Sequence, residues 1–368
     1  MAMSRIAVLS LSAILSVAAA STALPASASS RSATEAISTS LSGSTFRPAS
    51  TTASEPEIKT PEDVLAYLAA NKDKVSLVAR PGLNHNSTKE FPFASTFKLF
   101  HLAAYVTAVH KGTIDPEEKV PMATWKAYHL PGTDGGAYDN AVKRLKPGTT
   151  VTIDQLVSAM IIESDNASTD YLRHRLGERA LIAAAKTGGG PAPRQVNTIN
   201  GESLRMAGCQ KTADQCLADH VAKGGNTTPP TLPDFATQAA WANTVTLAQP
   251  RTVAKLINAI ARNKYVSAEA SALARKHLEW PMRNGFQHPK IAALGTKGGM
   301  FPGVLSEAAY YIPKGKGRAR TIVLAMRDMS ASTWASAVTS YAHQLFLLRL
   351  ATDPTYFAKV KAALTAPR

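Results

Sequence analysis

The sequence predicts a protein of the α/β class, in its α+β form, with an antiparallel sheet flanked by N- and C-terminal helices and an inserted all-helical lobe. Three observations support this prediction. A helix and a strand are expected near the start of the chain, helices dominate its middle, and strands followed by a last helix are expected near its end. Because both ends contribute to one lobe, the helical middle is an insertion. The cleft between two such lobes is a usual place for a ligand pocket.

The first expected element is a helix that begins at Thr60-Pro61-Glu62-Asp63. Thr is a good N-cap, Pro suits the first helical position, and acids in the first turn complement the helix dipole. Apolar residues over Val64–Ala69 recur with helical spacing, and the apolar run Val75–Ala79 predicts a short strand. The segment Phe97–Val109 is almost wholly apolar and Gly112 follows it, so we expect a buried helix there.

The middle and the end of the chain differ in their periodicity. The middle predicts helices at Ile153–Ile162, Thr169–Leu176, Thr252–Ala261 and Ala268–Trp280. The end predicts strands at Ile291–Thr296, Ala308–Ile312 and Thr321–Met326, and one long final helix at Ser332–Leu350. A basic turn that contains Gly joins the last two strands, which favours an antiparallel hairpin.

Composition and charge narrow the class of protein. Of 368 residues, 45% are hydrophobic and 18% are charged, which is typical of a globular protein. The net charge of +15 invites a nucleic-acid function. The Lys and Arg residues are dispersed, however, and their densest run, Lys314–Arg320, coincides with the predicted hairpin turn. The charge therefore indicates a solvated basic surface, and we expect no nucleic-acid partner.

The N-terminus has the features of a secretory signal peptide, which we place at residues 1–28. Arg5 supplies positive charge, Ile6–Ala20 is apolar but broken by serines, and Ala26-Ser27-Ala28 offers a cleavage site of small residues. The apolar stretch is too short to cross a membrane. We therefore expect an exported protein, periplasmic or extracellular, without a membrane span.

The rest of the chain divides into a leader and one large domain. Residues 29–55, rich in Ser, Thr and Ala, are expected to form a flexible leader. Residues 56–368 are expected to form a two-lobed catalytic domain. Its α/β lobe comprises 56–92 and 282–368, and its helical lobe comprises 93–281.

The two cysteines, Cys209 and Cys216, lie close together in a polar segment. In an exported protein an even pair of cysteines predicts a disulfide, here one that closes a short loop. Metal binding and catalysis are weaker interpretations, because no His or Cys lies at ligand spacing.

The strongest candidate for chemistry is the pair Ser95 and Lys98. A serine hydroxyl is a poor nucleophile until a base removes its proton, and the i, i+3 spacing places Lys98 on the same helix face. Among apolar side chains the charged form of a lysine is disfavoured, so Lys98 can act as that base. At a helix start, the Ser95 N–H can also stabilise an oxyanion. The alternative is a helix cap beside a surface lysine, against which the flanking Phe93, Phe97 and Leu99 argue.

Two further motifs lie downstream. Ser164-Asp165-Asn166 follows the predicted helix Ile153–Ile162, and Lys297-Gly298-Gly299 follows a predicted strand. A fixed cation at Lys297 can attract a substrate carboxylate and lower the proton affinity of Ser164. Taken alone, each motif has a purely structural interpretation, as a turn after a helix or as the end of a strand. Asp165 is expected to be structural and to hold the turn.

In their order, Ser-x-x-Lys, Ser-Asp-Asn and Lys-Gly resemble the motif set of penicillin-recognising serine enzymes, and the chain resembles the class A β-lactamase family. The resemblance implies a β-lactamase/transpeptidase-like fold. It implies that Ser164 relays a proton towards the leaving nitrogen and that Asn166 orients Lys98 and the substrate amide. It also implies that the Met300 backbone supplies the second oxyanion N–H.

The sequence departs from the family pattern at two places. Lys-Gly-Gly stands where the family has Lys-Thr-Gly, so one hydroxyl donor to a substrate carboxylate is lost at Gly298, while Gly298 and Gly299 still allow close backbone approach. The family places a deacylating glutamate on a loop after Ser-Asp-Asn. Here Glu202, within Asn200–Leu204, is the candidate, and its alternative interpretation is an exposed loop acid.

The resulting hypothesis is an exported serine hydrolase that opens β-lactam amides through a Ser95 acyl-enzyme. A D,D-peptidase or esterase of the same fold is an alternative, and a non-catalytic β-lactam or cell-wall binding module is an alternative of another class. The partner expected is a small-molecule β-lactam or a peptidoglycan-like acyl donor. No His-Glu-x-x-His and no phosphate-binding Gly loop occurs, so we expect no metal and no cofactor. We also expect a monomer.

Overall fold

The computed structural model describes residues 56–225, 228–315 and 317–366. The predicted signal peptide, 1–28, and the predicted leader, 29–55, lie outside these residues. Within them, no helix is both long enough and apolar enough to cross a membrane.

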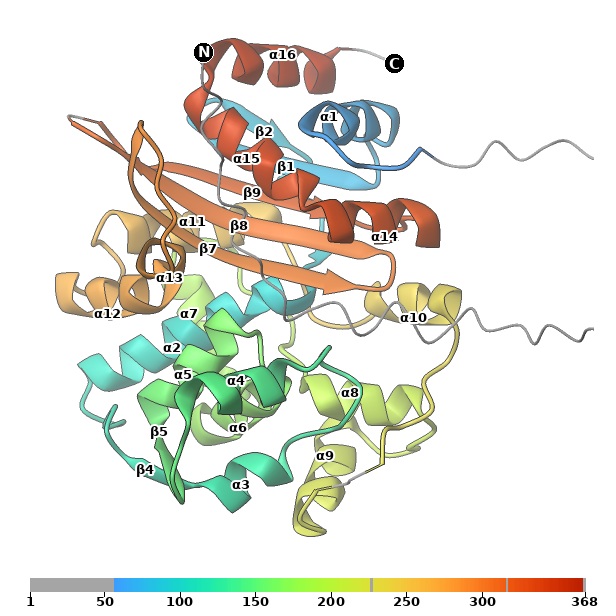
Figure 1. Cartoon of the computed structure of the whole chain (residues 1–368), viewed down its shortest axis with the longest axis vertical. Coiled ribbons are helices and arrows are strands. Elements are labelled where there is room, and N and C mark those ends of the chain that lie inside the picture. Colours follow the sequence, from blue (N-terminus) through green and yellow to red (C-terminus); the bar gives the residue numbers. More distant parts are fainter. Residues whose placement is uncertain (1–55, 226–227, 316, 367–368) are drawn as a thin grey trace, which may run out of the picture.

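The architecture is organised around a five-stranded antiparallel sheet with the strand order β2-β1-β9-β8-β7 (Figure 1). Its strands are β1 (Val75–Arg80), β2 (Leu83–His85), β7 (Ile291–Phe301), β8 (Val304–Pro313) and β9 (Arg320–Met326). Strand β1, near the start of the chain, pairs with β9, near its end, and Leu77 lies opposite Leu324. The sheet therefore joins both ends of the described chain, which confirms the predicted fold class.

Helices from the two ends of the chain cover the outer face of the sheet: α1 (Pro61–Ala70), α14 (Ala331–Ser340), α15 (Ala342–Thr352) and α16 (Pro354–Thr365) (Figure 1). Successive side chains of a strand point to opposite faces. Leu77 and Leu324 accordingly pack with these helices in an outer hydrophobic cluster, whereas Val78 and Val323 belong to an inner cluster. The alternating apolar residues of the strands thus serve two cores.

Helices from the middle of the chain form a layer on the inner side of the sheet (Figure 1). These are α2 (Lys98–His110), α3 (Met122–Ala127), α4 (Ala137–Leu145), α5 (Ile153–Ile162), α6 (Asn166–Leu176), α7 (Glu178–Thr187), α8 (Ile199–Met206), α9 (Ala213–Ala222), α10 (Phe235–Ala242), α11 (Pro250–Ala261), α12 (Ala268–Leu278) and α13 (Trp280–Arg283). Helix α2 is buried without interruption from Lys98 to Val106, as its apolar sequence predicts. Helix α11 packs directly on β8 and β9.

The prediction of an all-helical middle is incomplete. Short antiparallel pairs also occur there, namely β4 (Lys119–Pro121) with β5 (Thr150–Thr152), and β3 (Phe91–Pro92) with β6 (Leu247–Ala248). The helix predicted over Ala268–Trp280 ends at Leu278, and Trp280 begins the separate helix α13.

The prediction of a single final helix over Ser332–Leu350 is wrong. The separate helices α14 and α15 cover this range, and α16 follows them. Helix α14 stops at Tyr341, whose φ of 53° lies in the left-handed region, which an L-residue helix does not pass through. Asp353 then caps α16, with Pro354 at the first helical position.

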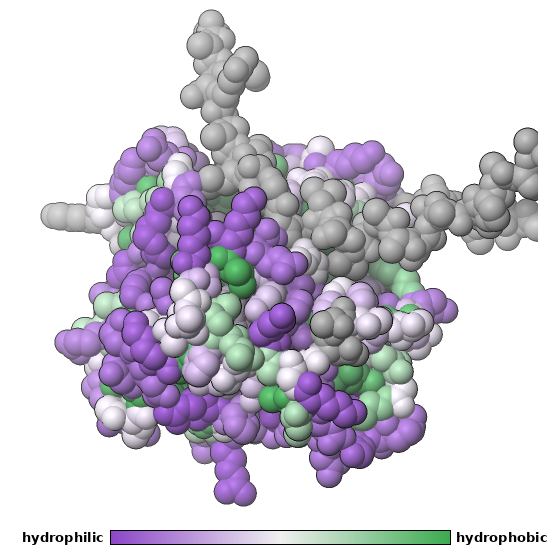
Figure 2. Space-filling model, turned by 60° about the horizontal axis from the view of Figure 1, so that its bottom comes forward, coloured by the Kyte–Doolittle hydropathy of each residue, from purple (hydrophilic) through white to green (hydrophobic). Residues whose placement is uncertain are grey.

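The face of the molecule in Figure 2 is mostly hydrophilic, with hydrophobic side chains in small scattered groups. Among the described residues, the large hydrophobic side chains with high exposure are Val266 and Leu345. The hydrophobic side chains are therefore concentrated in the two clusters on either side of the sheet.

The outer cluster yields a test of the fold. Phe346→Ala should lower the free energy of unfolding by about 3–5 kcal/mol, because Phe346 is fully buried in this cluster and its loss leaves a cavity. Leu345→Ala, one residue earlier and 44% exposed, is the matched control and should change it by less than about 0.5 kcal/mol. Urea unfolding measures both values. Equal effects of the two variants would contradict the packing of α15.

Candidate active site

A tight turn at the start of the buried helix brings Ser95 and Lys98 together. Ser95 lies in the short 3₁₀ helix η1 (Ala94–Phe97), and Lys98 is the first residue of α2. In a 3₁₀ helix, side chains at i and i+3 eclipse one another, so the spacing aligns these two residues. Lys98 is fully buried, whereas Ser95 is half-buried. The alternative of a surface lysine at this position is therefore wrong.

The buried amine of Lys98 is held by the Ser-Asp-Asn turn. It donates to the Ser164 carbonyl oxygen (2.5 Å), to Ser164 Oγ (3.2 Å) and to Asn166 Oδ1 (2.8 Å). These acceptors are all uncharged, and none belongs to Ser95. Burial lowers the pKa of Lys98 well below its usual range, the charge of Lys297 adds to this effect, and nearby acids oppose it more weakly. The amine consequently has a low affinity for a proton.

The turn itself is held by Asp165. Ser164 follows α5 with a φ of 66°, a left-handed conformation that few non-glycine residues adopt. Fully buried, Asp165 caps α6 by accepting from the N–H groups of Ala167 (3.1 Å) and Ser168 (2.7 Å). It also accepts from Trp125 Nε1 at 2.9 Å. These contacts agree with the structural role that the sequence predicts for Asp165.

Lys297, on strand β7 of the sheet, contacts the Ser164 hydroxyl. Its amine donates to Ser164 Oγ at 3.0 Å and to the Gly298 carbonyl oxygen at 2.7 Å, and the residue is 4% exposed. Burial lowers the pKa of Lys297 to about 8. The Ser164 hydroxyl thus lies between two lysine amines, one from α2 and one from β7.

Strand β7 passes directly against the turn that carries Ser95. A Cβ atom on Gly299 would lie 2.4 Å from the Phe93 carbonyl oxygen and 2.6 Å from the Thr96 nitrogen, so glycine is required at this approach. Two hydrogen bonds fix the contact: Thr96 Oγ1 donates to the Lys297 carbonyl oxygen (3.2 Å), and Ser306 Oγ donates to the Phe93 carbonyl oxygen (2.6 Å). The strand segment that leads to Met300 is therefore adjacent to the Ser95 turn.

Glu202 is neither exposed nor in a loop. It lies in α8 and is only 5% exposed, so its interpretation as an exposed loop acid is wrong. Its Oε1 accepts from Asn197 Nδ2 at 2.6 Å, and its Oε2 pairs with Arg205 at 3.3 Å. The carboxylate therefore has a fixed orientation.

Asp170 anchors the helix that carries Glu202. Its carboxylate accepts from the backbone N–H groups of Ile199 (2.7 Å) and Asn200 (2.8 Å), the first residues of α8. Burial raises the pKa of Asp170 to about 7, against the effect of these hydrogen bonds. The sequence analysis did not single out this residue, because only the fold brings α6 and the start of α8 together.

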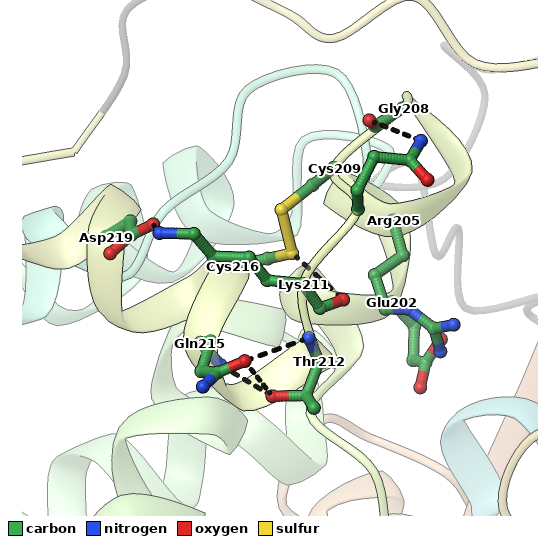
Figure 3. The surroundings of a disulfide bond; sticks show 10 residues. Glu202, Arg205, Gly208, Cys209, Lys211, Thr212, Gln215, Cys216 and Asp219 are labelled. Carbon is green, nitrogen blue, oxygen red and sulfur yellow. Dashed lines mark hydrogen bonds and ion pairs between the residues drawn. A yellow bond between two sulfur atoms is a disulfide. The ribbon is translucent and has the colours of Figure 1, made fainter.

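A disulfide joins Cys209, just after α8, to Cys216 in α9 (Figure 3). Figure 3 also shows Glu202 and Arg205 side by side on α8, near this bridge. The predicted disulfide is therefore present, and it limits the movement of α8 relative to α9.

Several of the residues described above line one cavity of about 300 Å³. Ser95, Ser164, Glu202, Lys297 and Met300 all line it, although they come from different elements. Its walls also contain residues that the sequence analysis missed: Asp134, Trp241 and Glu307. No local motif distinguishes these positions, because strand register and loop packing bring them to the cavity. In the part of the chain that the structure describes, no cluster of side chains has the composition of a metal site.

A family model described as the beta-lactamase enzyme family matches residues 62–344 of this chain. The chain belongs to the beta-lactamase enzyme family. This membership supports hydrolase activity of the β-lactamase type and the expected class of small-molecule substrate. A search of curated proteins finds no relative of matching sequence.

Solved β-lactamase structures share the fold. The β-lactamase from Sphaerobacter thermophilus has 19% sequence identity and a TM-score of 0.50, over 78% of this chain and 96% of that chain. A β-lactamase from Xanthomonas campestris pv. campestris has 14% identity and a TM-score of 0.52, over 79% and 99%. The class A β-lactamase of the last common ancestor of Gram-negative bacteria has 15% identity and a TM-score of 0.51, over 78% and 99%. The predicted β-lactamase-like fold is thus confirmed.

The buried turn of this β-lactamase family member yields a second test. Asp165→Asn should lower the free energy of unfolding by about 1–3 kcal/mol, because an amide nitrogen replaces an oxygen that accepts a hydrogen bond in a fully buried turn. Asp234→Asn is the matched control. Asp234 caps α10 at the surface through the Thr237 N–H, and Asn caps helices about as well as Asp, so we expect less than about 0.5 kcal/mol. Calorimetry compares the two variants, and equally small losses would argue against the structural role of Asp165.

Proposed function

We propose that this protein is an exported serine hydrolase that opens β-lactam amides through an acyl-enzyme on Ser95, which water then hydrolyses. The observation that carries the proposal is the Ser164 hydroxyl, which receives hydrogen bonds from both Lys98 and Lys297. A hydroxyl between two buried amines, one of low proton affinity, offers a short path for proton transfer. Membership of the β-lactamase family supports the class of substrate.

Acylation begins when Ser95 loses its proton to the neutral amine of Lys98 and its Oγ attacks the substrate carbonyl carbon. The low pKa of Lys98 supports this role, because a neutral amine has a lone pair to accept the proton. Asn166, which holds the amine at 2.8 Å, orients Lys98 and the substrate amide. As the C–N bond breaks, Ser164 passes its proton to the leaving nitrogen and receives from Lys98 the proton that came from Ser95, so that both groups return to their starting states. The charge of Lys297 lowers the proton affinity of the Ser164 hydroxyl.

The negative charge that develops on the carbonyl oxygen requires hydrogen-bond donors. We assign this role to the backbone N–H groups of Ser95 and Met300. The close approach of β7 to η1 at Gly299 supports the assignment, because it brings the two backbone segments next to each other.

Deacylation requires a base that activates water, and we assign this role to Glu202. Glu202 lines the same cavity as Ser95, and its carboxylate is fixed by Asn197. The helix that carries it is anchored at both ends, by Asp170 at its start and by the disulfide of Cys209 just after its end. A base held this firmly suits water activation at one position.

Two observations favour a second candidate, a D,D-peptidase or esterase of the same fold. Gly298 offers no hydroxyl to a substrate carboxylate, and the Glu202 carboxylate is already engaged by Asn197 and Arg205. A non-catalytic binding module is a poorer explanation, because burying the Lys98 amine without an ion pair is costly and serves no purpose in a site that only binds.

The proposal includes location and partners. The disulfide supports export, since such bonds persist in oxidising compartments, either periplasmic or extracellular. The mechanism uses side chains and water alone, so it needs no cofactor and no nucleic-acid partner. We propose a monomer that acts on a β-lactam or a peptidoglycan-like acyl donor.

The first functional test replaces the nucleophile. Ser95→Ala should abolish the mass increase after incubation with a β-lactam and reduce turnover of a chromogenic cephalosporin by at least about 10³-fold, because no acyl-enzyme can form. Ser332→Ala, at an exposed position in α14, is the control and should retain both. Intact mass spectrometry and absorbance measure the two quantities. Persistent turnover by Ser95→Ala would exclude Ser95 as the nucleophile.

The second functional test separates the two half-reactions. Glu202→Gln should leave acylation intact but slow deacylation by about 10²–10⁴-fold, because the general base is lost, so a long-lived adduct on Ser95 accumulates. Glu163→Gln, at another acid that lines the cavity, is the matched control and should not trap the adduct. Time-resolved mass spectrometry follows the adduct. Trapping by the Glu163 variant alone would identify that residue as the hydrolytic acid.

A further inference from the structure

A buried carboxylate occupies the space beside the Lys-Gly-Gly strand. Gly298 in β7 lies opposite Glu307 in β8, and a Cβ atom on Gly298 would lie 2.8 Å from Glu307 Oε2. Glu307 is only 2% exposed and lines the same cavity as Ser95 and Lys297. The Glu307 carboxylate therefore occupies the space that a side chain at position 298 would need.

The surroundings of Glu307 keep its carboxylate in place as an acceptor. Thr296 Oγ1 donates to Oε1, Gln344 Nε2 donates to Oε2 at 3.4 Å, and His343 Nε2 lies 3.7 Å from Oε2. His343 is 3% exposed, and its Nδ1 is buried without a hydrogen-bond partner among the described residues. Gln344 and His343 also line the cavity, so Glu307 and its partners form one part of the cavity wall.

Glu307 and Lys297 carry opposite charges. The negative charge of Glu307 acts to raise the pKa of Lys297, whereas burial lowers it. The other charged residues in the cavity wall are acids as well: Asp134, Glu163 and Glu202. Glu163 is paired with Arg144 and Glu202 with Arg205, whereas Glu307 has no arginine or lysine partner within 4 Å in the part of the chain that the structure describes. Lys297 is the single lysine in this wall, within the described residues, and the negative charge of Glu307 acts on it.

We propose that Glu307, together with Gly298 and His343, forms a subsite that excludes a substrate carboxylate and accepts acyl donors with a hydrogen-bond-donating group, uncharged or cationic, at that place. This inference rests on the proposed function and specifies its substrate class. An anion placed beside Gly298 would stand close to Glu307 Oε2, because even a Cβ atom there would lie 2.8 Å from it, and two like charges this close inside a protein repel strongly. An amide or ammonium group there instead meets an acceptor, the Glu307 carboxylate.

A matched pair of substrates tests the subsite on the unmodified protein. One is a chromogenic cephalosporin with its free C4 carboxylate, and the other is the same molecule as its primary carboxamide. We expect kcat/KM to be at least about tenfold higher for the carboxamide. The assay contains 0.15 M salt, because the Debye length is then about 8 Å and the attraction of anions to the distant basic surface is screened.

Two variants assign the effect to Glu307. Glu307→Gln keeps the shape and removes the charge, so it should raise kcat/KM for the carboxylate by about tenfold and lower that for the carboxamide, whose charged hydrogen-bond acceptor becomes neutral, so that the preference is lost. Glu307→Asp keeps the charge and should keep the preference. A preference of the unmodified protein for the carboxylate, or an unchanged ratio in Glu307→Gln, would overturn the inference.

A binding measurement tests the subsite independently of the proposed function. Calorimetry with Ser95→Ala measures the affinity for both molecules without any reaction. If neither molecule labels Ser95 in the unmodified protein, the proposed function fails, and the calorimetric ratio still decides the subsite. Tighter binding of the carboxylate would overturn the subsite, whereas tighter binding of the carboxamide would support it. Labelling of Ser95 by both molecules with a preference for the carboxylate would leave the function standing and overturn the subsite.

Discussion

The amine of Lys98 lies in the protein interior without a hydrogen-bonded carboxylate, and the rest of the site is arranged around this constraint. Its acceptors must be uncharged oxygens, because an ion pair would raise the pKa that burial lowers. Ser164 and Asn166 supply them from one turn, and that turn exists because Ser164 adopts a left-handed backbone conformation. Asp165 stabilises this conformation from within the core rather than by pairing with the amine.

The same constraint explains why the site needs both layers of the molecule. The helix that buries Lys98 cannot provide the second amine at Ser164, which comes from β7 of the sheet. Strand β7 can approach the Ser95 turn this closely because Gly299 has no side chain, and Thr96 and Ser306 fix this contact with hydrogen bonds. The geometry of the Ser164 hydroxyl is therefore a property of the packed molecule and not of any single motif.

Local signals in the sequence predicted much of the fold. The capping residue Thr60 gave the start of α1, and the apolar run over Ile153–Ile162 gave α5 with its observed bounds. The break at Tyr341 was missed because no Gly or Pro marks it, so the periodic pattern continues through the residue that ends α14. The motifs pointed to Ser95, Lys98, Ser164 and Lys297. In the structure Ser95, Ser164 and Lys297 line one cavity, while the buried Lys98 contacts the Ser164 hydroxyl. Glu307 was not found, because its place beside Gly298 depends on the register of β7 and β8.

The pairing of β1 with β9 has a consequence for how the molecule is made. A ribosome delivers β1 early and β9 only when almost the whole polypeptide has been synthesised. Until then the central neighbour of β1 is missing and its apolar side chains lack their core. Contacts between residues so distant in sequence also form slowly. The nascent chain is therefore aggregation-prone during synthesis, and binding by chaperones at this stage would protect it.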